Sequence, residues 1–382
     1  MSDPGAAAEW AASGAVALTG PEQGSPRVPP GRAAAYAAEL GALFDVDGAA
    51  LLGERAALTG HRRRGRVSAG GSCRLLPLDG GWAAVSCARP DDPALLGAVV
   101  GCPVSDDDPW PVLAGALATM TPSALDARAG LLGVAAHSVP DQPPATAPAA
   151  VTAPPRSVRD ALVVSFGALW AGPLCAQLLA GRGARVVTVE TPQRPDRSRW
   201  AQPGFHALLH ARERSVVLDP ADPGDRVALR ALVAAADVVV EASRPRAVRG
   251  FGLDADAEVA RGTTWVSITA AGRDSERVGF GDDVAASAGL VARDADGLPV
   301  FAGDAIADPL TGLTAAALAL TGPGVLHDVS MTRVAASTLD GSPGGDACGL
   351  VVAAPRARPA RGPAPAFGAD TAAVLAELGV RR

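Results

Sequence analysis

The 382-residue sequence contains no lysine and no asparagine, so all of its strongly basic side chains are arginines. A Schiff-base lysine, a Walker-A lysine and a lysine general base are therefore excluded, together with the enzymes that depend on them. Alanine, glycine, valine, leucine and proline dominate instead, a bias typical of GC-rich genomes. At this length we expect two bodies, because single hydrophobic cores usually stop growing near about 250 to 300 residues.

The chain is acidic overall and has no extended cluster of basic residues. Its net charge is −6, its pI is about 5.4, and the one dense basic run, His61–Arg64, is short. We therefore expect no nucleic-acid partner. No stretch approaches the roughly 20 apolar residues of a membrane-spanning helix, and the N-terminal residues lack the order of a signal peptide. We expect a cytoplasmic protein with no membrane partner.

Cysteine and histidine are few and scattered. The cysteines form no Cys-x-x-Cys pair, which argues against a disulfide framework and against a metal site. We predict each cysteine to be a buried structural thiol and each histidine to be a packing or surface residue. No metal and no permanently bound cofactor is expected. The residues concerned are Cys73, Cys87, Cys102, Cys175 and Cys348, and His61, His137, His206, His210 and His327.

Composition divides the chain into four parts. Residues 142–155 are a run of proline, alanine and threonine that predicts an extended linker. Before it, residues 1–141 predict a small α+β body with a hairpin of Ser72–Pro77 and Trp82–Cys87. Residues 156–339 form the second domain. Residues 340–382 predict a docking tail that ends in a short helix.

The second domain alternates short β-branched runs with alanine-rich helical segments, which is typical of a parallel sheet covered on both faces. We therefore predict an α/β fold with a doubly wound, Rossmann-like sheet beside the smaller α+β body. The expected strands are Ala161–Phe166, Ala184–Glu190, Ser215–Leu218, Val238–Glu241 and Trp265–Thr269, and the expected helices include Leu174–Ala180 and Asp225–Ala235.

Two places in this domain could carry chemistry. The turn Gly167–Pro173 leads into a helix N-terminus, which attracts anions, but its spacing is not the Gly-x-Gly-x-x-Gly of a dinucleotide site. Asp308 directly precedes Pro309, a pattern that fits both a helix N-cap and a carboxylate nucleophile. The adjacent acids Asp282 and Asp283 fit helix capping better than paired-carboxylate catalysis. No Ser/His/Asp order favours a serine hydrolase.

An approximate internal sequence repeat links the two halves of the chain. Trp10–Val16 recurs approximately as Val284–Leu290, and each copy is followed by a glycine- or proline-containing turn and an alanine-rich helix. The second copy is followed by Asp308, whereas the first has no acid at the corresponding place. Because alanine-rich helices resemble each other by chance, the pattern alone leaves both duplication and chance similarity open.

Several segments between residues 157 and 337 together resemble the class III CoA transferases of the CaiB/BaiF type. That family includes formyl-CoA transferase, the carnitine and bile-acid CoA transferases and the 2-methylacyl-CoA racemases. The order and spacing of the segments are more specific than any one of them. They are Trp170–Pro173, Gly183–Glu190, Arg214–Asp219, Ala236–Glu241, Gly322–Gly324 and Asp328–Ser330.

The resemblance implies a reaction and a site. Asp308 matches the aspartate that attacks an acyl-CoA thioester, so CoA would pass to a carboxylic acid through an aspartyl intermediate. CoA would be a substrate and product. By resemblance, the residues expected to bind it are Ala168, Leu169, Trp170, Ala171, Glu190, Thr191, Arg199, Ala242, Ser243 and Arg249.

Three departures from the family pattern keep alternatives open. Thr191 and Ala242 stand where relatives usually carry arginine and asparagine facing CoA, and no histidine precedes the helix that begins near Asp283. The two lost CoA contacts keep open a homologue that binds acyl-CoA without turnover. The missing histidine makes a racemase-like activity less expected than transfer, although Asp282 or Asp283 could take the place of that base. Glu190 and the α/β pattern keep a nucleotide-dependent oxidoreductase as a further alternative.

In the family the small domain follows the α/β domain, whereas here the part that resembles it, residues 1–141, comes first. The resemblance therefore implies a truncated fusion of two family copies. A homodimer and a monomeric fused unit are both compatible with the sequence.

Overall fold

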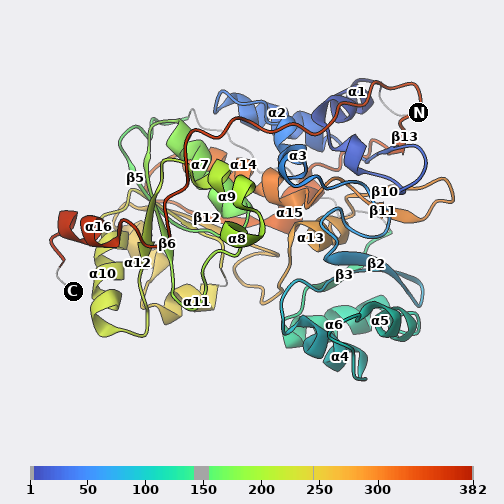
Figure 1. Ribbon diagram of the computed structural model, residues 1–382, viewed down its shortest axis with the longest axis horizontal. Coiled ribbons are helices and arrows are strands. Elements are labelled where there is room, and N and C mark those ends of the chain that lie inside the picture. Colours follow the sequence, from blue (N-terminus) through green and yellow to red (C-terminus); the bar gives the residue numbers. More distant parts are fainter. Residues whose placement is uncertain (1–3, 142–154, 244, 381–382) are drawn as a thin grey trace.

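The computed structural model describes residues 4–141, 155–243 and 245–380. All of the predicted linker except Pro155 therefore lies outside the described residues. No described helix is both long and apolar enough to cross a membrane. Figure 1 shows a large body built around the main sheet and a smaller lobe that carries β2, β3 and α4–α6.

The main sheet has six parallel strands in the order β12-β9-β8-β5-β6-β7. Their β-branched runs are buried on both faces, as in β8, where all four residues are buried. The predicted doubly wound fold is confirmed. The strands are β5 (Leu162–Phe166), β6 (Arg185–Glu190), β7 (Arg214–Val217), β8 (Val238–Glu241), β9 (Thr264–Thr269) and β12 (Leu326–Ser330).

Helices cover both faces of this sheet (Figure 1). One face packs against α7 (Ala171–Gly181), α14 (Ala307–Ala319) and α15 (Met331–Ser337), and the other against α10 (Pro223–Ala234), α12 (Ala255–Ala260) and α16 (Thr371–Glu377). Gly312 allows α14 to approach α7 closely, because a Cβ there would lie 2.8 Å from the carbonyl oxygen of Ala171. This contact brings the first turns of the two helices together.

The smaller lobe is an antiparallel sheet covered by helices, with its own apolar core. The predicted hairpin is present as β2 and β3. Its elements are β2 (Cys73–Leu78), β3 (Gly81–Ser86), β4 (Ala136–Val139), α4 (Asp92–Val100), α5 (Trp110–Leu117) and α6 (Pro122–Leu132).

Residues 4–59, which precede this lobe in the chain, pack on the large body instead. Their elements are α1 (Pro4–Ser13), η1 (Val16–Leu18), α2 (Ala33–Ala42), η2 (Ala50–Gly53) and α3 (Glu54–Thr59). Buried side chains such as Trp10 and Leu51 share one apolar core with Leu174 of α7 and Leu310 of α14. The four-part division of the chain stays a prediction, but the first part contributes to both bodies.

The C-terminal segment runs across the large body and ends at α16 (Figure 1). Arg358 binds the buried carboxylate of Glu54 with Nε 2.7 Å from Oε1, and Asp370 accepts a 2.8 Å hydrogen bond from the backbone N–H of Ser215 in β7. The segment therefore ties α3 to the edge of the sheet.

Short elements complete the fold. They are the paired strands β1 (Arg27–Val28) and β13 (Gly345–Asp346), the paired strands β10 (Val291–Arg293) and β11 (Pro299–Phe301), and the helices α8 (Ser198–Ala201), α9 (Pro203–His210), α11 (Pro245–Gly250) and α13 (Gly281–Ser287).

The two segments of the approximate repeat, Trp10–Val16 and Val284–Leu290, have similar local structure. Each includes helical residues, in α1 and α13, and in each a serine hydroxyl donates to the carbonyl three residues earlier, Ser13 to Trp10 and Ser287 to Val284. This similarity is consistent with duplication, which stays a prediction.

The prediction that every cysteine is buried was wrong. Cys73 and Cys175 are buried, but Cys87 and Cys102 are only partly buried and Cys348 is exposed. Burial raises the pKa of the Cys87 thiol to about 11. Cys348 is exposed because it lies in the tail, where the chain follows the surface instead of crossing a core.

Candidate functional site

The strand order places a crevice at the carboxyl ends of β5 and β8. From β5 the chain winds outward through β6 and β7, and from β8 through β9 and β12, so the winding direction changes between these two strands. Ligands of open α/β sheets bind at such a switch point. The turn after β5 is compact because Gly167 and Gly172 touch: a Cβ on Gly167 would lie 2.8 Å from the backbone of Gly172.

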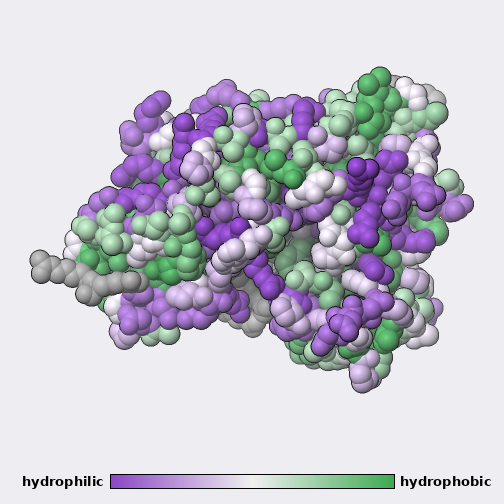
Figure 2. Space-filling view, viewed as in Figure 1, coloured by the Kyte–Doolittle hydropathy of each residue, from purple (hydrophilic) through white to green (hydrophobic). Residues whose placement is uncertain are grey.

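A cavity of about 900 Å³ opens at this edge of the sheet. Its lining comes from the turns after β5, β6, β7, β8 and β9, from α11, from residues 275–280 before α13 and from Arg89 of the smaller lobe. Figure 2 shows the surface hollowed between the large body and that lobe. The cavity therefore lies where the two bodies face each other, and three arginines, Arg89, Arg194 and Arg277, line it.

Six of the residues expected to bind CoA line this cavity together with Asp308. They are Ala168, Leu169, Ala171, Thr191, Ala242 and Ser243.

The other four expected CoA contacts have different surroundings. Trp170 is buried beneath the turn, with its ring edge-to-face on Phe205 at 5.1 Å. Glu190 and Arg199 form an ion pair with each other, and Arg199 also donates to the carbonyl of Pro365 at 2.9 Å. Arg249 is exposed on α11 and is not among the residues that line the cavity.

Asp308 lies in the first turn of α14, and its side chain faces the cavity. It is not the N-cap, because that position belongs to Ile306 and the helix begins two residues earlier than predicted. Ala305, which has a positive φ of 46°, forms the tight turn that starts the helix early. The backbone N–H of Ala171 donates to the Asp308 carboxylate, which therefore lies between the starts of α7 and α14.

A group of buried acids surrounds Asp308. Burial, together with the carboxylates of Asp282 and Asp283 and against the opposing effect of Arg55, raises the pKa of Asp308 to about 7. Burial and the neighbouring Asp304 raise the pKa of Asp282 to about 6. At neutral pH, Asp308 is thus balanced between its acid and carboxylate forms.

Arg55, on α3, supplies the positive charge of this group. Its Nε lies 2.9 Å from Asp304 Oδ2 and a second nitrogen binds Oδ1, so the pair is bidentate. Burial raises the pKa of Asp304, but Arg55 outweighs it and holds that pKa well below its usual range. The guanidinium also lies over the Trp170 ring at 5.0 Å, and His61 Nδ1 is 3.2 Å from Asp304. No local motif marks Arg55, because its partner is far away in the sequence.

Asp283 has the structural contacts of a helix-start acid. Its Oδ1 accepts hydrogen bonds from the backbone N–H of Phe280 at 3.0 Å and from Ser86 Oγ at 2.6 Å. His137 Nε2 lies 3.3 Å from its Oδ2. These contacts link α13 to β3 and β4 of the smaller lobe, as expected for a capping residue.

One group of described residues could hold a metal ion, although the sequence analysis expected no metal site. It comprises Asp196, His206 and His210, all buried. The sequence contains one indication of this metal site, because His206 and His210 are four residues apart and therefore lie on one face of α9. Asp196 carries no such signal, since it comes from the loop before α8.

Fold and site together define an α/β protein with a carboxylate-bearing cavity at the switch point of a parallel sheet. The family model for CoA-transferase family III matches residues 158–367, more than half of the chain. The chain therefore belongs to CoA-transferase family III.

Relatives of known activity match shorter stretches. The chain is 35% identical over 107 residues to a succinyl-CoA–D-citramalate CoA-transferase of Chloroflexus aurantiacus, covering 26% of this chain and 27% of that one. It is 29% identical over 171 residues to a succinate–glutarate CoA-transferase of Agrobacterium fabrum, covering 40% and 43%. The chain thus matches less than half the length of these relatives.

Among solved structures, a CaiB/BaiF family protein from Brucella suis is 27% identical, with a TM-score of 0.44, covering 49% of this chain and 56% of that one. A hypothetical protein from Mycobacterium tuberculosis has the same identity and TM-score, covering 48% and 57%.

Proposed function

We propose that this chain moves CoA from an acyl-CoA thioester to a carboxylic acid, with Asp308 as the nucleophile. The observation that carries the proposal is the position of the Asp308 side chain on the wall of the switch-point cavity, beside the turn after β5. Ala168, Ala242 and Gly279 line the same cavity, and such small side chains leave room for a bulky thioester.

The proposed reaction proceeds through covalent intermediates on Asp308. A carboxylate oxygen attacks the thioester carbonyl, and the thiolate of CoA leaves to give an aspartyl–acyl anhydride. The thiolate then attacks the aspartyl carbonyl and releases the donor acid, which leaves an aspartyl-CoA thioester. The acceptor carboxylate repeats these two steps in reverse, so that the acceptor leaves as a CoA thioester and Asp308 is regenerated.

The surroundings of Asp308 suit these steps. The N–H of Ala171 binds the ground-state carboxylate, and the positive end of α14 lies at the same place. Both favour negative charge on oxygen in the tetrahedral intermediates. The segment before α13, where a racemase would carry its histidine base, lines the cavity through Val278, Gly279 and Phe280 and contains no histidine, which favours transfer over racemisation.

Binding without turnover is the second candidate. Thr191 and Ala242 line the cavity where relatives usually carry arginine and asparagine, so two polar contacts to CoA are absent. Arg194 and Arg277 line the same cavity and could contact the CoA phosphates instead.

A covalent adduct on Asp308 distinguishes the two candidates. We expect incubation with a panel of succinyl-, glutaryl- and formyl-CoA to add a mass that hydroxylamine removes, because anhydrides and thioesters react with that nucleophile. Intact-mass spectrometry of the wild type and of Asp308→Ala provides the measurement. A mass increase in both proteins would place the nucleophile elsewhere, and CoA binding without any adduct would favour the binding-only candidate.

The rate of adduct formation should depend on pH. The ionised carboxylate is the nucleophile and the pKa of Asp308 is about 7. Below pH 7 the rate should therefore rise roughly tenfold per pH unit, and it should level off above pH 8. Stopped single-turnover labelling from pH 5 to 9 measures the profile. A rate independent of pH down to 5 would contradict the raised pKa.

A further inference from the structure

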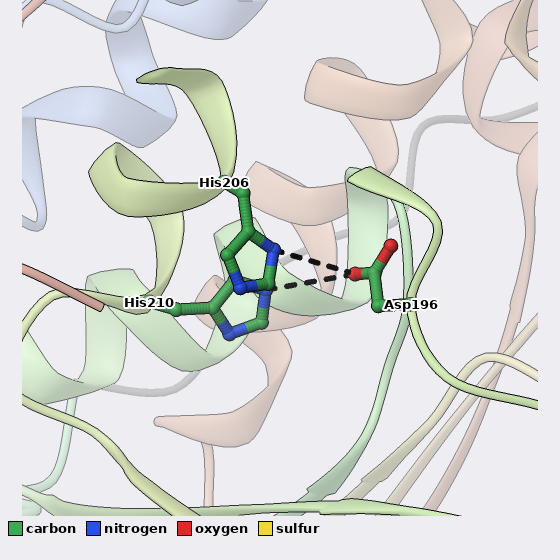
Figure 3. Close-up of side chains that lie close together, drawn as sticks. All are labelled: Asp196, His206 and His210. Atoms are coloured by element: carbon green, nitrogen blue, oxygen red, sulfur yellow. Dashed lines mark ion pairs between the residues drawn. The ribbon is translucent and has the colours of Figure 1, made fainter. Parts of the chain in front are cut away.

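A second group of ionisable side chains lies behind the cavity and takes no part in the proposed reaction. It joins α9 to the loop before α8, and its members Asp196, His206 and His210 are each less than 5% exposed. Figure 3 shows both imidazole rings directed toward the same carboxylate oxygen of Asp196. The rings are stacked, with centroids 4.2 Å apart.

The donor atoms are close to the spacing that a metal ion requires. Asp196 Oδ2 is 3.9 Å from His206 Nδ1 and 3.7 Å from His210 Nε2, and one donor atom of each residue lies within 4.8 Å of the others. A tetrahedral ion with bonds of about 2.0 to 2.1 Å separates its ligand atoms by about 3.4 Å. The two distances from Asp196 are therefore within about 0.5 Å of those of a bound ion, and small rotations of the imidazole rings would bring their donor atoms to the same spacing.

The outer contacts of His210 match those of a metal ligand. Its Nδ1 lies 2.8 Å from Glu213 Oε2, and the same oxygen accepts a 2.6 Å hydrogen bond from Thr188. A carboxylate that binds one ring nitrogen directs the lone pair of the other nitrogen outward, which is the usual arrangement around metal-bound histidine. His210 Nε2 has no hydrogen-bond partner among the described residues.

Charge balance also favours a cation here. Asp196 and Glu213 are both buried carboxylates, and buried charges need compensation. A divalent ion between neutral imidazoles would cancel both of these negative charges.

We infer that Asp196, His206 and His210 form a binding site for a divalent transition-metal ion of the zinc type. Two imidazoles and one carboxylate are a donor set that such ions accept, with a fourth position left for a further ligand. Binding at His206 Nδ1 replaces the 2.8 Å hydrogen bond that this atom shares with Ser198 Oγ.

The site has a structural consequence for the cavity. Asp196 Oδ2 also accepts a hydrogen bond of 3.1 Å from the backbone N–H of Leu169. Leu169 lines the cavity and has a left-handed φ of 67°, which is unusual for a residue other than glycine. An ion bound to Asp196 therefore stabilises the turn after β5 through this hydrogen bond, on the side of the turn away from the cavity.

Direct metal titration of the full chain tests this inference, whatever the outcome for the proposed function. After chelator treatment, we expect Co²⁺ to bind with one equivalent per chain and to show the visible bands of a four-coordinate ion, and Zn²⁺ to displace it. The variants His206→Ala, His210→Ala and Asp196→Asn should bind more than 100-fold more weakly. Glu213→Gln should bind about 10- to 100-fold more weakly, because Glu213 only orients His210.

The control is His327→Ala, which removes a histidine from β12 and should leave the affinity for Co²⁺ unchanged. Absence of saturable Co²⁺ binding to the wild type would overturn the inference by itself, even if a variant fails to fold. Binding that His210→Ala and Asp196→Asn leave unchanged would also overturn it. Circular dichroism establishes that each variant compared is folded.

Discussion

Replacing Asp308 with asparagine should abolish CoA transfer and at the same time stabilise the fold at alkaline pH. Loss of the nucleophile should lower the exchange rate on the order of 10³-fold or more. The pKa of Asp308 rises from 3.8 to about 7 in the folded protein, so its ionised form opposes folding. Asparagine cannot ionise and keeps nearly the same shape.

The sign of the stability effect depends on pH. A raised folded-state pKa means that the penalty is absent below the unfolded pKa near 4, grows between pH 4 and 7, and is complete above pH 7. We expect Asp308→Asn to be about 1 to 2 kcal/mol more stable than the wild type at pH 8. That is less than the full shift implies, because Asp308 faces the cavity and remains partly exposed.

Urea unfolding at pH 4.5 and pH 8 measures this difference. Asp45→Asn is the matched control, because the Asp45 side chain is 85% exposed and its removal should change stability little at either pH. If the pKa of Asp308 were not raised by folding, Asp308→Asn would be no more stable than the wild type at either pH. A less stable Asp308→Asn at pH 8 would therefore contradict the raised pKa.

The strands of the sheet could be predicted because their signal is local. Val238–Val240 is a continuous β-branched run, and the structure has the predicted strand Val238–Glu241 with the same bounds. The start of α14 was predicted less well, since Pro309 marks a first turn but cannot show that Ala305 adopts a left-handed backbone. Asp308 was consequently assigned as a possible cap, although the helix already includes it.

The contacts of the site that the sequence did not predict join residues that lie far apart along the chain. Arg55 reaches Asp304 across the apolar core shared by the first and last thirds of the chain. The ring of Trp170 is buried against Phe205, a contact between residues 35 positions apart that no local pattern predicts. Spacing along the chain predicts which residues share a helix face, whereas it does not predict which loop packs opposite them, as with Asp196.

Replacing Arg55 with methionine should destabilise the protein and move the pH dependence of the reaction. Asp304 is fully buried, and its bidentate partner would be lost. Removal of one partner from a buried ion pair usually lowers the free energy of unfolding by about 3 to 5 kcal/mol. Arg55 also lowers the pKa of Asp308, so its removal should shift the midpoint of adduct formation above pH 7.

The double variant Arg55→Met with Asp304→Asn separates the two effects. It removes both charges of the pair, so most of the lost stability should return, since a neutral pair leaves no uncompensated buried charge. The midpoint should nevertheless stay above that of the wild type, because Asp308 still lacks the nearby positive charge. Asp304→Asn alone keeps Arg55 and should not raise the midpoint. Urea unfolding and single-turnover labelling from pH 5 to 9 measure both quantities, and a double variant with the wild-type midpoint would show that Arg55 supports only the fold.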